Sequence, residues 1–296
     1  MKVLLAIDSS EFSEPVISEI AARTWPADST VFVLTVVDLF ALTYSVGYLK
    51  PFIKNENNAA RALVQSVAER LASRGIETVT QVVESYPATC IVEQAENWDA
   101  DFIFVGSHGH SGVARFFLGS IAKGVLRNAP CSVGIVRRAA KRSRTNGKRV
   151  LLATDGSAHA EAAARSVCGR PWPEGAEFRI VSAVDAMIPL MDPWYAAGEV
   201  LDQIRMQNKK ECEDAVLSVH KIVTHAGLTA TTAILSGSPK LRIIEYAQEW
   251  DADLIVIGSH GRRGLDRLAL GSVSEAVAMN AECSVEVIRS RALLDV

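Results

Sequence analysis

Short runs of apolar, β-branched residues alternate along the whole chain with longer segments of helical periodicity. In the first half this pattern predicts strands over 2–7, 31–37, 78–83, 102–106 and 132–136, and helices over about 13–24, 56–74, 88–97 and 120–128. In the second half it predicts strands near 149–154, 178–184, 229–235, 253–258 and 284–288. The runs from Leu4 to Ile7 and from Ile103 to Val105 are apolar throughout, which is typical of strands buried on both faces of a parallel sheet. The predicted fold class is α/β, with two doubly wound, five-stranded parallel-sheet domains.

Three segments of the first half recur in the second half with nearly the same sequence. The matching pairs begin at Lys2 and Arg149, at Trp98 and Trp250, and at Cys131 and Cys283. The offset between copies is 147 residues for the first pair and 152 residues for the other two. Repetition over this length indicates a duplicated domain.

The copies also set the predicted domain boundaries. We expect one domain over 1–138, a second over 148–296 and a linker over 139–147. The stretch 137–149 around this linker carries seven basic residues in thirteen. A nucleic-acid-binding patch is one interpretation, but the stretch lacks aromatic residues and lies between the repeats, which favours a solvated linker.

Length and composition agree with two packed domains and exclude some classes of function. The 296 residues, 49% of them hydrophobic, suit two domains of roughly 100–200 residues each. A formal charge of −3 gives no general attraction to nucleic acid or to an anionic membrane. No apolar run approaches the ~20 residues that span a bilayer. Because the first strand is followed at once by acidic residues and the five cysteines form no Cys-x-x-Cys pair, we expect no signal peptide and a cytoplasmic location.

One glycine-rich pattern occurs once in each half. Gly-Ser-His-Gly, nine residues and then Gly-Ser runs from Gly106 to Ser120 and again from Gly258 to Ser272. Each copy follows a predicted strand and leads into a predicted helix, an arrangement that exposes backbone N–H groups to an anion. Helix capping by the serines is the alternative, and Ser272 to Glu275 has the sequence of a capping box. Because the spacing is the same in both halves while the nine intervening residues differ, we favour an anion site.

The pattern contains neither a Walker A loop nor a clean Gly-x-Gly-x-x-Gly fingerprint. It resembles the nucleotide-binding signature of the universal stress protein family. The resemblance extends to Asp-x-Ser after the first strand of each half (Asp8 to Ser10, Asp155 to Ser157) and to the Val-Asp that ends at Asp38 and at Asp185. It covers nearly the whole chain, twice.

The resemblance implies ATP bound in each half. Asp8 and Asp155 are candidates to help hold Mg²⁺ through the phosphates, and the sequence shows no dedicated metal cage. By position, Asp8 and Asp155 would contact the ribose, and the backbone of Val36 and Ala183 would contact the adenine edge. The phosphates would lie on Gly106, Gly109, Gly119, Ser120, Gly258, Gly261, Gly271 and Ser272. Ala6 and Ala153 would flank the nucleotide at the end of the first strand. The family also commonly pairs along the fifth strand, which implies an internal pseudo-dimer of the two halves.

The two halves differ beside the shared glycines. Arg262 follows the second loop glycine in one half, where the other half has His110, and Ser274 stands where the first half has Ala122. Arginine is fully charged at neutral pH, whereas histidine is mostly neutral. We therefore count Arg262 and Ser274 among the nucleotide-binding residues and predict that the second half holds a triphosphate more tightly.

The leading hypothesis is an ATP-dependent switch in stress response or signalling, with protein partners and a homodimer among its expected contacts. The alternatives are a slow Mg²⁺-dependent ATPase and a non-catalytic oligomerisation module. We predict no catalytic residue and no protein metal ligand, and we interpret the loop histidines His108 and His260 as packing residues. The segments 38–55 and 185–200 are rich in aromatic residues and methionine, and they suit a lid or an interface equally well.

Overall fold

The structure is a computed structural model of the whole chain. It describes residues 1–38, 50–108, 118–137, 147–184, 198–262 and 270–290. The chain forms two compact units, Met1–Ala140 and Lys141–Val296. Apart from Gly147, the predicted linker lies outside the described residues, and the predicted domain boundaries remain predictions.

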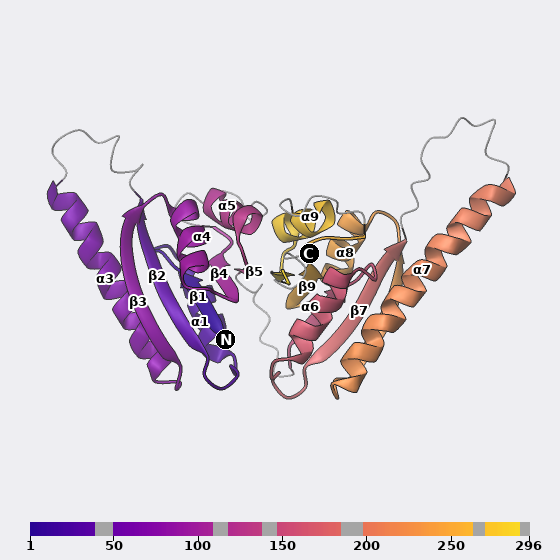
Figure 1. The fold of residues 1–296 in the computed structure, drawn as a ribbon, viewed down its shortest axis with the longest axis horizontal. Coiled ribbons are helices and arrows are strands. Elements are labelled where there is room, and N and C mark those ends of the chain that lie inside the picture. Colours follow the sequence, from indigo (N-terminus) through magenta and orange to yellow (C-terminus); the bar gives the residue numbers. More distant parts are fainter. Residues whose placement is uncertain (39–49, 109–117, 138–146, 185–197, 263–269, 291–296) are drawn as a thin grey trace. The chain divides into compact units, whose positions relative to one another are not determined.

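Unit 1 is a five-stranded parallel sheet with helices between the strands (Figure 1). Its elements are β1 (Lys2–Ala6), α1 (Ser13–Ala22), β2 (Thr30–Asp38), α3 (Lys50–Ala72), β3 (Glu77–Ser85), α4 (Pro87–Asn97), β4 (Phe102–Gly106), α5 (Ser120–Asn128) and β5 (Ser132–Val136). The strand order is β3-β2-β1-β4-β5, and each neighbouring pair is parallel.

Unit 2 repeats this arrangement. Its elements are β6 (Arg149–Ala153), α6 (Ala158–Cys168), β7 (Glu177–Val184), α7 (Gly198–His225), β8 (Ala230–Ser236), α8 (Pro239–Glu249), β9 (Leu254–Gly258), α9 (Ser272–Asn280) and β10 (Ser284–Ile288). The order β8-β7-β6-β9-β10 matches that of unit 1 and is again parallel. The predicted fold class of two five-stranded, doubly wound α/β domains is confirmed, while the internal pseudo-dimer remains a prediction.

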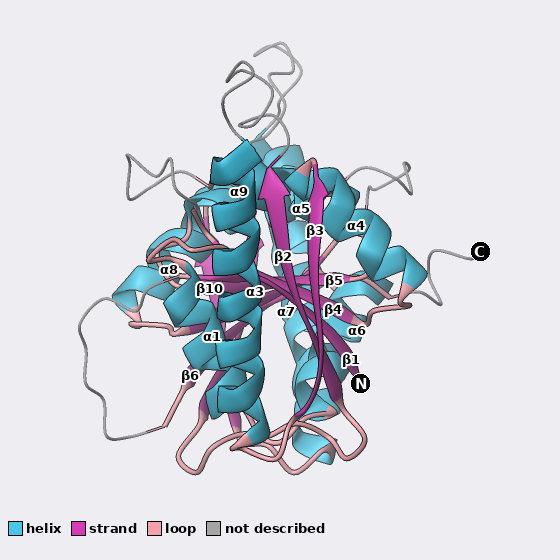
Figure 2. Ribbon diagram, turned by 90° about the vertical axis from the view of Figure 1, so that its left-hand side faces the viewer, coloured by secondary structure: helices cyan, strands magenta, loops and turns pink. Residues whose placement is uncertain are grey.

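The core of each unit lies around its two central strands. Leu4, Leu5 and Ile103 have no exposed surface, because β1 and β4 are covered on both faces as their apolar sequences predict. The long helix α3 packs along β2 and β3 (Figure 2), and α7 packs in the same way on β7 and β8. The central strands are therefore rigid supports for whatever follows their carboxyl ends.

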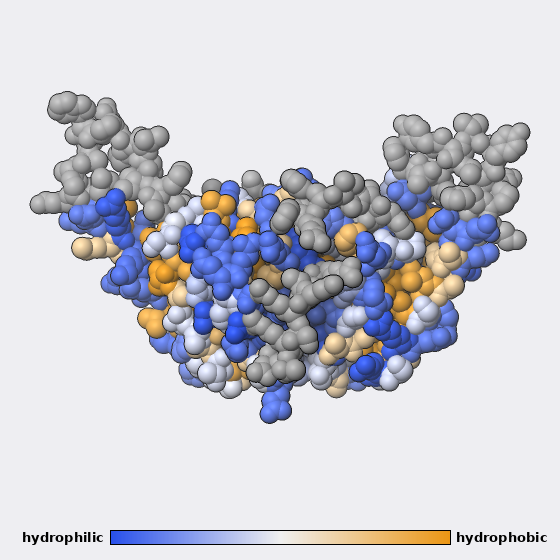
Figure 3. Space-filling view, turned by 180° about the vertical axis from the view of Figure 1, so that it is seen from behind, coloured by the Kyte–Doolittle hydropathy of each residue, from blue (hydrophilic) through white to orange (hydrophobic). Residues whose placement is uncertain are grey.

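On the face drawn in Figure 3, hydrophobic residues gather in small patches separated by hydrophilic ones. The most exposed large apolar side chains, Met206, Leu241 and Tyr86, are 72%, 61% and 58% exposed. Among the described helices, none has the length and apolar character needed to cross a membrane.

The Trp-Asp-Ala-Asp repeat has a structural explanation. Asp101 accepts a hydrogen bond from the backbone N–H of Lys2, and the Lys2 ammonium donates to the Trp98 carbonyl, at 2.8 and 3.2 Å. In unit 2 the backbone N–H of Arg149 donates to Asp253 at 2.8 Å, and its guanidinium donates to Trp250 O at the same distance. This repeat therefore ties the turn before the fourth strand of each unit to the start of the first strand.

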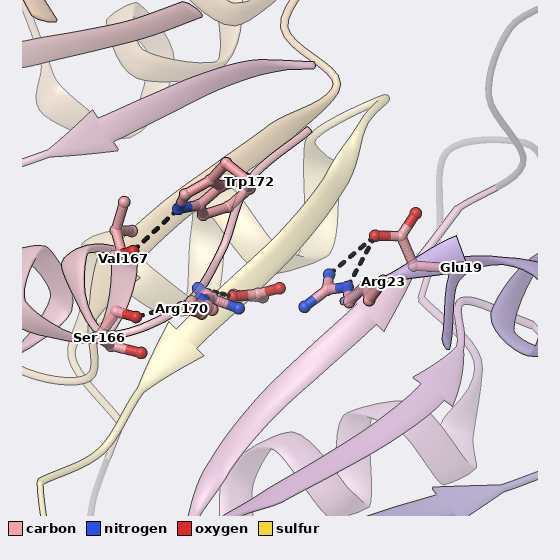
Figure 4. Close-up of polar contacts among 7 residues, drawn as sticks. Glu19, Arg23, Ser166, Val167, Arg170 and Trp172 are labelled. Carbon is pink, nitrogen blue, oxygen red and sulfur yellow. Dashed lines mark hydrogen bonds and ion pairs between the residues drawn. The ribbon is translucent and has the colours of Figure 1, made fainter. Parts of the chain in front are cut away.

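An ion pair between Arg170 and Glu286 lies in the interior of unit 2. Arg170 Nη2 is 2.5 Å from Glu286 Oε2, and the two side chains are only 8% and 1% exposed. Figure 4 shows Arg170 also donating to the carbonyl of Ser166, and the Trp172 indole donating to that of Val167, at 3.1 and 2.9 Å. Burial of both charges makes this pair sensitive to the loss of either partner.

Unit 1 fills the equivalent space with an aromatic ring. Arg23, the counterpart of Arg170, pairs with Glu19 of its own helix at 2.9 Å (Figure 4). Its guanidinium lies 4.8 Å from the centre of the Phe104 ring. Gly134 stands at the position of the buried glutamate, and a Cβ there would lie 2.3 Å from the Phe104 ring. The absence of a side chain at Gly134 is therefore what makes room for the phenylalanine.

Candidate functional site

Each glycine loop leaves the sheet where the winding reverses. β1 has β2 on one side and β4 on the other, and Ala6 lies in register with Val105, one residue before Gly106. Ala153 lies in register with Ile257, one residue before Gly258. Ligands of doubly wound sheets bind at this place, past the carboxyl ends of the strands.

In unit 2 the backbone brings the two ends of the glycine pattern together. Ser259 N–H donates to Ile288 O of β10 at 2.9 Å, and Gly271 N–H donates back to Ser259 O at 2.8 Å. A Cβ on Gly271 would lie 3.0 Å from Ser259 O and 3.3 Å from His260 Cα, so the close approach requires glycine or a local shift. The nine-residue spacing thus places the loop beside the start of α9.

Unit 1 has the same backbone arrangement. Ser107 N–H donates to Val136 O at 3.1 Å, and Gly119 N–H donates to Ser107 O at 2.8 Å. Gly106 is equally crowded, because a Cβ there would lie 2.9 Å from Phe12 O. Gly109 lies outside the described residues.

Both helices after the loops begin without a side-chain cap. Gly119 and Gly271 are the N-cap residues of α5 and α9, and neither helix has a side-chain hydrogen bond at its N-cap. The first intrahelical bonds are Lys123 N–H to Gly119 O and Glu275 N–H to Gly271 O, both at 2.9 Å. The preceding N–H groups of each first turn remain available for an anion.

The capping-box interpretation of the second helix is wrong. Ser272 is the first residue of α9 rather than its N-cap, so its side chain is not placed to cap the turn. Both Ser120 and Ser272 are exposed beside the loop. Both serines are therefore accessible at the predicted phosphate position.

The two aspartates after the first strands are bound differently. Asp8 Oδ1 accepts hydrogen bonds from Ser10 N–H, Ser10 Oγ and Ser13 Oγ, at 3.0, 2.5 and 2.9 Å. Asp155 accepts from Ser157 N–H on Oδ1 and from Arg262 N–H on Oδ2, at 3.0 and 2.9 Å. Asp155 thus joins the turn after β6 to the loop after β9.

Gly261 is held close to the same carboxylate. A Cβ on Gly261 would lie 2.6 Å from Asp155 Oδ2, a distance that real Cβ contacts do not show. Any larger residue must displace Asp155 and its bond to Arg262. The glycine that the sequence predicts at the phosphates is therefore also required by the packing of the loop.

The loop histidines are held by their neighbouring serines. Ser107 Oγ lies 3.0 Å from His108 Nδ1, and Ser259 Oγ lies 3.0 Å from His260 Nδ1. His260 is only 6% exposed, which agrees with its interpretation as a packing residue. The residues that pack against these rings distinguish the units.

In unit 1 the Phe12 ring lies 5.1 Å from the His108 ring, whereas in unit 2 His159 lies 4.9 Å from His260. The Nδ1 atom of His159 is buried without a hydrogen-bond partner. Burial lowers the pKa of His159, and the charge of His260 lowers it further, against an opposing effect of Asp155. His159 is thus favoured in its neutral form.

Two predicted phosphate contacts of unit 2 have partners inside the protein. Ser274 is 4% exposed, and its hydroxyl donates to Gly258 O at 2.6 Å. This hydrogen bond joins helix α9 to the start of the glycine loop. Arg262 Nη1 donates to Glu211 Oε2 on α7 at 2.7 Å. Each group therefore has an acceptor in its own unit, and its contact with a ligand remains a prediction.

The residues predicted at the adenine lie near the ends of their strands. Val36 and Ala183 are half-buried and pair in register with Val83 and Leu235. Of the aromatic segments 38–55 and 185–200, residues 39–49 and 185–197 lie outside the described residues, and the role of these segments remains open. In the described part of the chain, no cluster of three or more His, Cys, Asp or Glu side chains is placed to bind a metal ion.

Sequence reasoning missed several residues that shape these sites. Ser13, His159 and Glu211 carry no motif, and Glu211 lies 51 residues from its partner Arg262. An alignment of the two halves could have found Phe12 against His159 and Ser13 against Ala160. No signal in the sequence could have placed Glu211 opposite the loop.

Two doubly wound units, each with a glycine loop beside an uncapped helix start, define a tandem α/β protein with one candidate anion site per unit. The model of the universal stress protein family matches residues 1–137 and again residues 147–289. The chain belongs to the universal stress protein family and contains its domain twice.

Individual relatives agree with this assignment. A universal stress protein of Mycolicibacterium smegmatis is 26% identical, over 98% of this chain and 97% of the relative. One from Methanocaldococcus jannaschii is 34% identical over 48% of this chain and 82% of its own length. The crystal structure of a universal stress protein from Archaeoglobus fulgidus has the same fold, with a TM-score of 0.66 at 23% identity, over 97% of this chain and 96% of that one.

Proposed function

We propose that this protein binds ATP in each unit and acts as a nucleotide-dependent switch in a stress response. The observation that carries the proposal is the repeated junction of a glycine loop with an uncapped helix start, seen in both units. Backbone N–H groups and the helix dipole at such a junction favour phosphate oxygens. The donor set therefore fits a polyphosphate.

The remaining parts of the site suit the rest of the nucleotide. Asp8 and Asp155 offer carboxylate oxygens, natural acceptors for ribose hydroxyls, at the ends of β1 and β6. Val36 and Ala183 offer strand-end backbone groups for the adenine edge. Gly106, Gly109, Gly119 and Ser120, and in unit 2 Gly258, Gly261, Gly271 and Ser272, would hold the phosphates, with Mg²⁺ bound through the phosphate oxygens.

The proposal treats the protein as a binding protein with protein partners, located in the cytoplasm. Each loop histidine has its Nδ1 beside a serine hydroxyl and packs against a second ring, a placement that suits support of the loop. A change of loop conformation on binding would alter the surface that a partner contacts. Homodimerisation is part of the same proposal.

The direct test is to denature the purified full-length protein and identify any released nucleotide by chromatography. A second sample is incubated with ATP and Mg²⁺ for hours. We expect bound ATP that survives the incubation. Steady accumulation of ADP would indicate an ATPase instead, and failure to retain or bind any nucleotide would reject the proposal.

A further inference from the structure

Arg262 lies across the turn that follows β6 and reaches helix α7. Its backbone N–H donates to Asp155, and its guanidinium donates to Glu211 at 2.7 Å. A Cβ on Gly156, which has a φ of +76°, would lie 2.9 Å from Arg262 Nη2. The guanidinium therefore rests on a turn that only glycine leaves open, with a carboxylate of α7 as its partner.

Unit 1 lacks this arrangement. The buried positions of α3 and α7 correspond at an offset of 152 residues: Val64 with Val216, Val67 with Val219, and Leu71 with Val223. At that offset Glu211 corresponds to Ala59, which is exposed on α3. Ser9 stands at the position of Gly156, and the sequence has His110 at the position of Arg262. Of the two units, only unit 2 therefore combines this arginine with an acidic partner on the long helix and a glycine beneath the guanidinium.

The pair is exposed enough to exchange partners. The side chains of Arg262 and Glu211 are 43% and 44% exposed. Ion pairs at this exposure change an equilibrium by less than about tenfold. A phosphate group, like a carboxylate, forms charge-assisted and often bidentate bonds with arginine, and a polyphosphate carries more negative charge than one carboxylate, so it can displace Glu211.

We propose that Glu211 sets the affinity of unit 2 for the phosphate groups of its ligand by competing for Arg262. The inference rests on the proposed nucleotide site and adds Glu211 to it as a residue that acts through Arg262. While Glu211 holds the guanidinium, the charge of Arg262 is neutralised, and the carboxylate itself repels an incoming polyphosphate. The pair therefore makes unit 2 discriminate by phosphate number, and an uncharged nucleoside is unaffected.

The test compares Glu211→Gln with Glu213→Gln in the full-length protein. Both changes remove one negative charge from α7. Glu213 faces Lys209 at 3.8 Å and is 49% exposed, close to the exposure of Glu211. Titration calorimetry with ATP and with adenosine measures both affinities. We expect Glu211→Gln to raise the affinity for ATP about threefold to fivefold and to leave the affinity for adenosine unchanged. Glu213→Gln should change neither.

The variant Arg262→Gln, alone and combined with Glu211→Gln, completes a double-mutant cycle. In that background Glu211→Gln should lose most of its effect on ATP, because the competition requires the guanidinium. Unchanged or weaker ATP binding by Glu211→Gln, in a protein that does bind ATP, would overturn the competition. Equal effects of Glu211→Gln and Glu213→Gln would do the same. If no variant bound ATP or adenosine, the proposed function itself would fall, and the competition with it.

Discussion

The loop after β4 and the loop after β9 share their glycines, their serine–histidine contact and their uncapped helix, yet different side chains brace them. In unit 1 Asp8 is bound by the hydroxyls of Ser10 and Ser13, and an aromatic ring packs on His108. In unit 2 Asp155 is bound by the loop backbone, and a second histidine packs on the first. The frame that would receive phosphate is therefore the same in both units, while the groups that tune it differ.

The difference continues into the core. Unit 2 holds Arg170 against the buried Glu286, where unit 1 has a glycine and the Phe104 ring. The arginine is retained in both units, but its partner is a charge in one and an aromatic face in the other. Several differences of this kind indicate that the side chains within each unit match one another, so equivalent substitutions should have different effects in the two units.

The largest effect is expected from breaking the buried pair. Arg170→Ala leaves Glu286 charged and uncompensated, which costs about 3–5 kcal/mol of stability in unit 2. The matched change Arg23→Ala should cost about 1 kcal/mol, because Glu19 is partly exposed. Hydrogen exchange of peptides from β10 and β5 measures each unit separately, and equal losses would contradict the difference in burial.

Nucleotide binding should respond next most strongly to the second loop glycine. Gly261→Val pushes a side chain into Asp155 and removes a fixed arginine from the site, so we expect ATP retention to fall by more than about tenfold, or ~1.4 kcal/mol. The same change at Gly109 should have a smaller effect. Equilibrium binding of ATP to both variants is the measurement, and an equal loss would remove the predicted asymmetry.

A smaller effect is expected where Ser274 and Ala122 differ. Ser274→Ala leaves the Gly258 carbonyl without its buried donor and should lower the stability of unit 2 by about 1 kcal/mol. The reciprocal Ala122→Ser in unit 1 provides the control, since that buried position already works without a hydroxyl. Hydrogen exchange in the loop after β9 reports the change, and an unaltered loop would show that the hydroxyl does not brace it.

The smallest effect concerns pH. Because the pKa of folded His159 is lowered below the unfolded value of about 6.5, the unfolded chain takes up a proton that folded unit 2 resists. The free energy of unfolding of unit 2 should therefore fall as the pH drops from about 6.5 towards the folded pKa. His159→Phe, which copies Phe12 of unit 1, should weaken this loss, and Phe12→His should introduce it in unit 1. Urea titrations at several pH values measure it, and a His159→Phe protein with an unchanged pH profile would refute the assignment.

Much of the architecture could be predicted because it depends on local pattern. Apolar runs such as β1 and β4, and the duplicated glycine loops, are continuous in sequence and need no long-range information. The helix α3 begins earlier than predicted, at Lys50 rather than near residue 56, because Pro51 resembles a helix-breaking signal although the first turn of a helix tolerates proline. The site was harder: Glu211, His159 and Glu286 act through contacts with residues 51 or more positions away, and no local pattern encodes such contacts.

The central claim is that one chain carries two nucleotide sites of unequal affinity. Titration calorimetry of the nucleotide-free, full-length protein with ATP tests it most directly. We expect two ATP molecules per chain, with affinities that differ by about tenfold, and loss of the tighter site in Gly261→Val. Two equal sites, or no binding at all, would contradict it.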